Sequence, residues 1–390
     1  MATIKFIGGD KYKGEVFRGD PHGKGIMYCA NGERYEGEFA QGVRQGKGTY
    51  YFTNGNKYVG EFKNDMRNGE GTFYYANGDT ESGEWKDGAL NGKCVTTWIN
   101  GERYEGNCED DERNGYGVYY YDNGDRYEGN WKNGNRHGHG VLYYENGDKL
   151  ESEWKNGYQN GPCTHYWANG DKFVGKSKDG EIYGENVFYY ADGCVACSNV
   201  VDGNTEGKGI LLYSNGEEFN LKIFQNGKLS EENRYRSPIN FLKLNLCVYY
   251  YTKSGGEELY FGQSENDLPH GKGIFVYEDN SVYVGEFLKG KKHGDGTLYP
   301  AQGGSEKQTF VHGDRYEKGS LYFLNGDRYE GDFLNGKLSG KGVYYYANGD
   351  RYEGCFKNGL KDGEGVYIFC NEKREKHLYK AGNLVNKTTL

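Results

Sequence analysis

The chain has 390 residues, with 65 glycines and 39 tyrosines but only 5 prolines. Glycine at this level without a three-residue period excludes a collagen-like chain, and so many aromatic residues exclude an intrinsically disordered one. The formal net charge of −9 leaves no basic excess to neutralise phosphates, so nucleic acid is not expected as a partner.

The remaining bulk features point to a protein of the cytoplasm. No apolar run approaches the roughly 20 residues that a membrane-spanning helix needs, and the N-terminal residues lack the apolar region of a secretory signal. The nine cysteines are odd in number and scattered along the chain. We therefore expect reduced thiols in a cytoplasmic protein, and not a framework of disulfides.

A pattern of 23 residues repeats in phase from Tyr12 to Phe219 and, after a break, from Tyr260 to Glu375. Each repeat is numbered here from its first patterned residue, position 0, which is most often Tyr. Glycine recurs at +2 and +11, an aromatic residue at +4, a β-branched residue at +14, and Asn-Gly at +19 and +20. Self-similarity of this kind predicts one supersecondary unit per repeat, stacked on its neighbours.

Asn-Gly between β-rich segments is typical of a two-residue type I′ hairpin turn, because both central residues of that turn need positive φ. A two-residue turn at Asn123-Gly124 pairs Tyr120 with Tyr127 and Val118 with Gly129. One face of the sheet is then expected to carry a tyrosine pair followed by a β-branched residue opposite glycine. The other face is expected to be solvated, with alternating charges beside further aromatic residues: Tyr119, Tyr121, Arg126, Glu128 and Asn130.

Tandem hairpins without a crossover segment form a meander, and apolar residues do not recur at helical spacing. The predicted fold is therefore all-β: an elongated, single-layer antiparallel β-meander of about sixteen 23-residue β-hairpin repeats. The predicted organisation is an N-terminal repeat array, a degenerate repeat or bend that contains Pro238, a C-terminal array and a tail. These parts cover residues 5–224, 225–258, 259–380 and 381–390.

The run Tyr-x-Gly-x-Phe/Trp, followed by Gly-x-Gly and then Asn-Gly, resembles the MORN repeat (membrane occupation and recognition nexus). The segments Arg34–Phe39 and Arg351–Phe356 are close to the family pattern, and the resemblance covers residues 5–380. It implies one β-hairpin per repeat and a scaffolding role at cytoskeletal structures, ciliary radial spokes or membrane contact sites. The pattern lacks its tyrosine at position 0 in some repeats, so the aromatic spine formed by these tyrosines should be interrupted at Glu81, Leu150, Ala196 and Glu306.

Candidate chemical sites are weak. Gly-x-Gly motifs such as the one at Gly23 are not followed by a helix whose N-terminus could hold a phosphate. Histidines in the same slot of successive repeats would lie roughly 10 Å apart, too far to share a metal ion, and Cys194 and Cys197 form a single Cys-x-x-Cys pair. A flat ribbon offers no enclosed pocket for acid–base catalysis. We therefore expect no catalytic residue, no metal, no cofactor and no enzymatic activity.

An aromatic stripe along one face is the remaining candidate site. It could serve only to stabilise the ribbon, or it could also form a groove for an extended or helical segment of a partner, because tyrosine and tryptophan are favoured at interfaces. The residues predicted for this partner-binding stripe are Tyr35, Tyr58, Phe62, Tyr104, Tyr127, Trp131, Tyr283, Phe287, Tyr329 and Tyr352.

The function predicted from these features is a non-enzymatic scaffold that binds protein partners at a cytoskeletal or axonemal assembly, such as a radial spoke of a cilium or flagellum. The alternative is a peripheral tether that binds anionic phospholipids, which the net acidity disfavours because such binding depends on clustered Lys and Arg. Charges at residues 373–376 would protect the last edge strand from aggregation. The family resemblance instead allows a homodimer through the C-terminal repeats.

Overall fold

The computed structural model describes residues 2–216, 218–225, 227–236, 241, 247–253, 256–311, 313–334 and 337–390. Within these ranges the chain forms 34 β strands and no helix, which confirms the all-β prediction. It divides into two compact units, Met1–Ile182 and Tyr183–Leu390. Parts of the predicted bend, at 226, 237–240, 242–246 and 254–255, lie outside the described residues.

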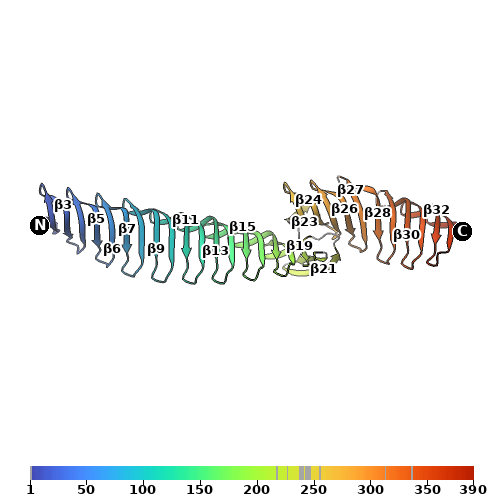
Figure 1. Ribbon diagram of the computed structural model, residues 1–390, viewed down its shortest axis with the longest axis horizontal. Coiled ribbons are helices and arrows are strands. Elements are labelled where there is room, and N and C mark those ends of the chain that lie inside the picture. Colours follow the sequence, from blue (N-terminus) through green and yellow to red (C-terminus); the bar gives the residue numbers. More distant parts are fainter. Residues whose placement is uncertain are drawn as a thin grey trace. The chain divides into compact units, whose positions relative to one another are not determined.

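The first unit is a run of antiparallel strands in which each strand pairs with the next one along the chain (Figure 1). Its strands are β1 (Ala2–Lys5), β2 (Lys11–Phe17), β3 (Asp20–Tyr28), β4 (Arg34–Ala40), β5 (Val43–Tyr51), β6 (Lys57–Lys63), β7 (Met66–Tyr74), β8 (Thr80–Lys86), β9 (Ala89–Thr97), β10 (Arg103–Glu109), β11 (Glu112–Tyr120), β12 (Arg126–Lys132), β13 (Asn135–Tyr143), β14 (Lys149–Lys155), β15 (Tyr158–Tyr166) and β16 (Lys172–Lys178).

The second unit contains two such runs, and β17 (Glu181–Tyr189) begins just before it. The first run continues with β18 (Val195–Val201), β19 (Asn204–Leu212), β20 (Glu218–Gln225) and β21 (Lys228–Arg236). The second run consists of β22 (Cys247–Lys253), β23 (Gly256–Glu265), β24 (Leu268–Val276), β25 (Val282–Leu288), β26 (Lys291–Tyr299), β27 (Ser305–Val311), β28 (Asp314–Tyr322), β29 (Arg328–Leu334), β30 (Lys337–Tyr345), β31 (Arg351–Lys357), β32 (Leu360–Ile368), β33 (Arg374–Lys380) and β34 (Asn383–Thr389). The predicted tail thus contains a strand that pairs with β33.

Two kinds of turn alternate along each run. The Asn-Gly loops are three-residue loops: the Tyr121 amide donates to the Asp125 carbonyl at 3.0 Å, and the Gly124 amide donates to the Tyr121 carbonyl at 3.2 Å. Gly124 has φ 88°, which makes this loop a type I turn followed by a glycine bulge. Type I′ turns of two residues lie at the opposite edge, as at Asn133-Gly134, where φ is 48° and 72°.

The register predicted for the Asn-Gly hairpins is therefore wrong by one residue. Tyr127 pairs with Tyr119, not with Tyr120, and Gly129 pairs with Gly117. The three-residue loop causes the difference, because it places one residue more between the strands than a type I′ turn would. Since side chains alternate between the two faces of a strand, a shift of one residue exchanges the faces on one side of the hairpin.

The two faces of the first unit differ in chemistry. The spine face carries the even positions of the first strand of each repeat and their partners, represented by Tyr119, Tyr121, Tyr127, Gly129 and Trp131. The charged face carries the residues between them, represented by Val118, Tyr120, Arg126 and Glu128. Tyr119 and Tyr121 were predicted on the charged face and lie instead beside Tyr127.

In the second unit the two runs pack face to face around a shared hydrophobic core, so the predicted single layer does not extend to this region. β19 contacts β23. The buried core residues are Val187, Val195, Cys197, Ile210, Leu212, Phe219, Leu221, Phe241, Val248, Leu259, Phe261, Ile274, Val276, Val282 and Val284.

Positions of the charged face build this core. Leu259 and Phe261 occupy positions −1 and +1, where the first unit has residues such as Arg126 and Glu128. Phe219, at position 0, pairs with Leu212 and so shares its face, whereas position 0 belongs to the spine face in regular repeats. The apolar character of these positions is a signal in the sequence that the predicted meander did not use.

A buried charge also joins the two layers. Lys208 of β19 is 7 % exposed, and its ammonium group donates to the Glu278 carbonyl at 3.1 Å. Its backbone amide donates to Glu257 Oε2 of β23 at 3.1 Å. Burial lowers the pKa of Lys208 and raises the pKa of Glu257. Ionic and polar contacts therefore accompany the hydrophobic packing of β19 on β23.

Candidate functional site

The tyrosines at position 0 form the centre of the spine face. Tyr127 is fully buried, and its ring lies over the facing glycines Gly129 and Gly140. A Cβ added at Gly129 would lie 2.8 Å from Tyr127 Cζ. The hydroxyl group donates to the Asn130 carbonyl at 3.2 Å. Each glycine pair therefore provides the space for one tyrosine ring, because a side chain at either glycine would occupy the place of that ring.

Aromatic residues at +4 lie between successive tyrosines. The Tyr127 ring meets Trp131 edge to face at 5.2 Å and Trp154 of the next repeat at 5.5 Å between ring centroids. The Trp131 indole also donates to the Gly117 carbonyl at 3.3 Å. Edge-to-face pairs add about 0.5–1.5 kcal/mol beyond the burial of their area. This tyrosine spine thus couples each repeat to the next one.

The ten residues predicted to bind a partner all belong to this spine. They are at most 5 % exposed: Tyr35, Tyr58, Phe62, Tyr104, Tyr127, Trp131, Tyr283, Phe287, Tyr329 and Tyr352. Within each unit the structure places its members of this set on one face of the sheet, but it buries them against glycines and one another. Their part in partner binding stays a prediction, and the accessible surface of this face is made by the rows beside them.

The aromatic row lies next to the spine, near the Asn-Gly loops. It consists of the residues at +15 and +17, which stack along the sheet: Trp98 contacts Tyr119 at 5.4 Å, and Tyr119 contacts Tyr121 at 4.7 Å. Most of these rings are partly exposed. The members of the row in the first unit are Tyr50, Phe52, Phe73, Tyr75, Trp98, Tyr119, Tyr121, Tyr144 and Trp167.

The arginine row lies on the other side of the spine and comes from position +9. A bulge in each second pairing places the +9 residue opposite the +4 aromatic residue, as with Arg136 and Trp131. The Arg136 guanidinium lies 4.0 Å from the Trp154 ring centroid and donates to the Gly157 carbonyl at 3.2 Å. The row consists of Arg44, Arg67, Arg113 and Arg136. Its 23-residue recurrence was visible in the sequence but was not recognised as a feature.

The charged face holds its basic and acidic residues as pairs along single strands. Arg126 Nη2 lies 3.0 Å from Glu128 Oε1, and Arg34 Nε lies 3.2 Å from Glu36 Oε1. The Arg126 guanidinium also lies 4.5 Å from the centroid of the Tyr143 ring. Because these cations have an acidic neighbour on the same strand, they present little unbalanced positive charge.

Burial of the tyrosine hydroxyl groups makes the fold sensitive to alkaline pH. Desolvation raises the pKa of Tyr35 and of Tyr104 to about 12 from an ordinary value near 10. A raised folded-state pKa means that this contribution to stability is complete below pH 10 and is lost as the pH rises through 12. We expect ultraviolet absorbance of tyrosinate above pH 11 to appear together with loss of the β circular dichroism signal. Tyrosines that ionise near pH 10 without unfolding would contradict this.

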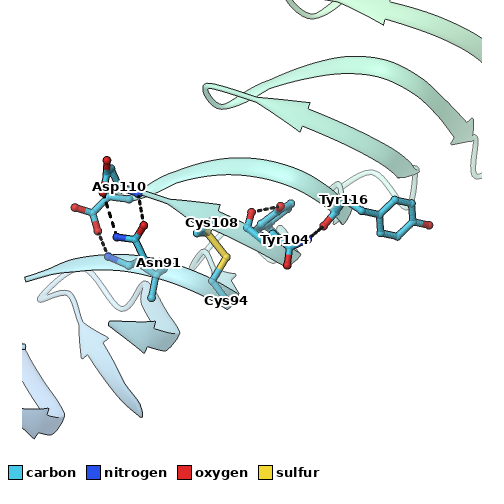
Figure 2. The surroundings of a disulfide bond; sticks show 9 residues. Asn91, Cys94, Tyr104, Cys108, Asp110 and Tyr116 are labelled. Atoms are coloured by element: carbon cyan, nitrogen blue, oxygen red, sulfur yellow. Dashed lines mark hydrogen bonds between the residues drawn. A yellow bond between two sulfur atoms is a disulfide. The ribbon is translucent and has the colours of Figure 1, made fainter. Parts of the chain in front are cut away.

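The spine is interrupted at Glu81, as predicted. The Tyr75 hydroxyl donates to Glu81 Oε2 at 2.8 Å, and burial raises the pKa of Glu81. Close to this interruption, Cys94 of β9 and Cys108 of β10 form a disulfide (Figure 2). The expectation that all cysteines are reduced thiols is therefore wrong for this pair. Sequence separation could not reveal it, because adjacency of the two residues depends on the strand register.

The other candidates raised by the sequence gain no support as sites. Cys197 is 3 % exposed, and burial raises the pKa of its thiol to about 12. Cys194, its partner in the Cys-x-x-Cys motif, is partly exposed. Among the residues that the structure describes, no group of three or more His, Cys, Asp or Glu side chains is placed to hold a metal ion. The same residues include no helix of the length and hydropathy that a membrane crossing requires.

Comparisons with known proteins identify the repeat. The sequence model of the MORN repeat matches residues 12–34, 35–57, 58–80, 82–103, 104–126, 127–149, 151–172, 198–218, 260–282, 283–304, 329–351 and 352–374. No curated protein matches the chain. These matches cover repeats in both units and confirm the resemblance drawn from the sequence.

Solved structures that align with the chain are distant in sequence and in shape. The TCP domain of SAS-4 (dCPAP) from Drosophila melanogaster, in complex with a proline-rich motif of Ana2, is 20 % identical, with a TM-score of 0.27, over 40 % of this chain and 84 % of that one. The TCP10 domain of CPAP from Danio rerio is 11 % identical, with a TM-score of 0.24, over 60 % of this chain and 99 % of that one.

Proposed function

Because the chain belongs to the MORN repeat family, we propose that it is a non-enzymatic scaffold that binds protein partners along the spine face of its repeats. The observation that carries this proposal is the pair of rows beside the buried spine. Partly exposed rings on one side and arginines on the other give a repeating surface on which an extended or helical segment could lie. Aromatic residues and arginine are the side chains most enriched where binding energy concentrates.

The proposal includes the place of the scaffold, which is a cytoskeletal assembly or the axoneme of a cilium or flagellum, within the cytoplasm. This part rests on the roles of MORN repeat proteins as scaffolds.

A tether to anionic phospholipids is the alternative that the charged face argues against. Attraction to an anionic membrane needs clustered Lys and Arg that are free to approach the headgroups. Here Arg328 lies 3.3 Å from Glu330, and Arg351 lies 2.9 Å from Glu353, so these two basic residues are already paired with carboxylates. The net charge of −9 adds general repulsion.

The chain offers matched variants for a test, because neighbouring tyrosines point to opposite faces. Replacing Tyr121 and Tyr144 by alanine removes rings of the aromatic row, whereas replacing Tyr120 and Tyr143 removes the same number of rings from the charged face. Proximity labelling with the full chain should identify cytoskeletal or axonemal proteins. Their labelling is expected to fall at least 10-fold for the first variant, since interface aromatic residues contribute about 2 kcal/mol or more each.

The controls distinguish loss of binding from loss of folding, and binding to lipid from binding to protein. Both double variants should keep the circular dichroism spectrum of the parent chain. Equal labelling by both variants would exclude the aromatic row as the binding surface. Flotation of the chain with phosphatidylserine vesicles at physiological salt would favour the phospholipid tether instead.

A further inference from the structure

The repeat that begins at Glu81 lacks the ring that covers the glycine pair in regular repeats. Glu81 is hydrogen-bonded to the Tyr75 hydroxyl. The atoms nearest to a Cβ built at Gly83 are backbone atoms of Lys93 and Cys94, whereas at Gly60 they include the ring of Tyr58. The space that a tyrosine ring occupies in regular repeats therefore contains no tyrosine between β8 and β9.

Two cysteines lie next to this space, at positions that other residue types occupy in regular repeats. Cys94 stands at +13, where regular repeats have the second glycine of the pair, and Cys108 stands at +4, where they have an aromatic ring. Cys94 faces Gly106, and Cys108 faces Gly92, so the bond crosses diagonally between β9 and β10. The exposed fractions are 3 % and 6 %.

Figure 2 shows the contacts on both sides of the bond. Asn91 and Asp110 exchange hydrogen bonds at 3.1 and 3.2 Å near the turn, and the Tyr104 hydroxyl donates to the Asn107 carbonyl at 2.8 Å on the other side. The disulfide thus lies in the line of the spine, where an edge-to-face contact joins neighbouring repeats elsewhere.

The chain holds a second interruption that serves as an internal comparison. Three repeats later, Leu150 stands at position 0, and Cys163 and Ser177 occupy the slots of Cys94 and Cys108. Leu150, Cys163 and Ser177 are all buried, and Ser177 Oγ donates to the Gly161 carbonyl at 3.3 Å. In that repeat an apolar side chain fills the space, and no cross-link is needed. At Glu81 the side chain is acidic, and the covalent bond provides the connection.

We propose that Cys94 and Cys108 form a redox-controlled joint of the first unit, in which the disulfide replaces the missing spine contact and its reduction opens β9 and β10 locally. The coupled reactant is a small-molecule disulfide such as oxidised glutathione. One protein thiolate attacks it and releases one small thiol, and the second protein thiolate then displaces the other small thiol. Two protein thiols lose two electrons and two protons, and one small disulfide becomes two thiols.

Burial of the two sulfur atoms limits the rate at which the disulfide is reduced or formed. Both sulfur atoms are shielded in the folded array, so exchange with a small thiol requires local opening of the hairpins first. Closing the bond restricts the segment between residues 94 and 108, and a loop of this length is stabilised by an amount that corresponds to on the order of 100-fold in the opening equilibrium. Reduction should therefore be slow, and its effect should be confined to the neighbouring repeats.

Hydrogen exchange of the full chain tests the proposal. The protein is incubated with oxidised glutathione or with a phosphine reductant, and peptides that cover β8 to β11 are compared with peptides from β3 to β6. We expect amide exchange in β9 and β10 to become on the order of 100-fold faster on reduction, with no change in β3 to β6. Cys108→Ser, which copies the natural Cys163 and Ser177 pair, should match the reduced parent chain under both conditions.

Cys163→Ser is the matched control, since it removes a buried thiol at the equivalent slot of the other interruption and should leave the redox response intact. Peptide mapping without reductant must show the bond between Cys94 and Cys108 in the oxidised sample. Two free thiols after oxidation would overturn the proposal. So would a linked pair whose reduction leaves exchange in β9 and β10 unchanged.

Discussion

Replacing Tyr58 by alanine is expected to lower the free energy of unfolding of its repeat by about 4 kcal/mol. The ring is fully buried, lies over Gly60 and Gly71, and meets both Phe62 and Trp85 edge to face. Its removal leaves a cavity over two glycines, which have no side chains that could fill it. Because repeats contact mainly their neighbours, the loss should appear as local opening around β6 and β7.

Urea unfolding combined with hydrogen exchange measures this loss, and two variants calibrate it. Tyr74→Ala removes a tyrosine of the charged face that is 37 % exposed, and it should cost less than about 1 kcal/mol. Tyr58→Phe keeps the ring and removes only the hydrogen bond to the Glu61 carbonyl, and it should cost about 1 kcal/mol. Similar effects of Tyr58→Ala and Tyr74→Ala would show that the spine does not carry the stability of the sheet.

Adding one methyl group at Gly60 is expected to be nearly as damaging as removing the ring. A Cβ there would lie 2.5 Å from Gly71 Cα and 2.6 Å from Tyr58 Cζ. The facing backbone cannot move away without breaking the strand pairing, so the Tyr58 ring must move off the glycine pair. We expect Gly60→Ala to cost about 3 kcal/mol, at the upper end of what overpacking causes. The midpoint of urea unfolding checks this value.

One control substitution and one compensating substitution test the predicted effect of Gly60→Ala. At Gly8→Ala the new methyl group meets no atom within 4 Å, so stability should change little. Tyr58→Leu should partly rescue Gly60→Ala, because the natural repeat at Leu150 carries Ser152 at the same +2 position. The two substitutions are in contact, and we expect them to be non-additive by about 1–3 kcal/mol. Strict additivity would mean that ring and glycine are not coupled.

The coupling between ring and glycine is visible in the composition of the repeats. Every repeat in which position 0 is tyrosine has glycine at both +2 and +13, and these repeats begin at Tyr12, Tyr35, Tyr58, Tyr104, Tyr127, Tyr260, Tyr283, Tyr329 and Tyr352. At Glu81 and Leu150, where the tyrosine is absent, +13 is Cys94 or Cys163. Residue types at positions 0, +2 and +13 therefore vary together because their side chains share one space.

The candidate site was predicted only in part. The sequence placed the ten stripe residues on one face, and within each unit its members do share a face of the sheet. An aromatic residue in a periodic pattern does not reveal how much of its ring is exposed. The answer depended on the glycine pairs, which let each ring lie flat against the backbone. The residues that remain accessible, such as Tyr121 and Arg136, were assigned to the wrong face or overlooked.

The sequence by itself determined the repeat length, the all-β class, the family and the interruptions of the spine, because each follows from residue types at fixed spacing. Tertiary structure decided the rest. The loop at Gly124 set the register and thus the composition of each face, since one residue more or less in a turn reverses every side chain of a strand. Strand pairing brought Cys94 to Cys108. Packing of β19 against β23 buried positions such as Phe261, whose partners across the core are distant along the chain. The apolar residues at these positions indicate that the positions are buried, but a local pattern does not identify the strand that packs against them.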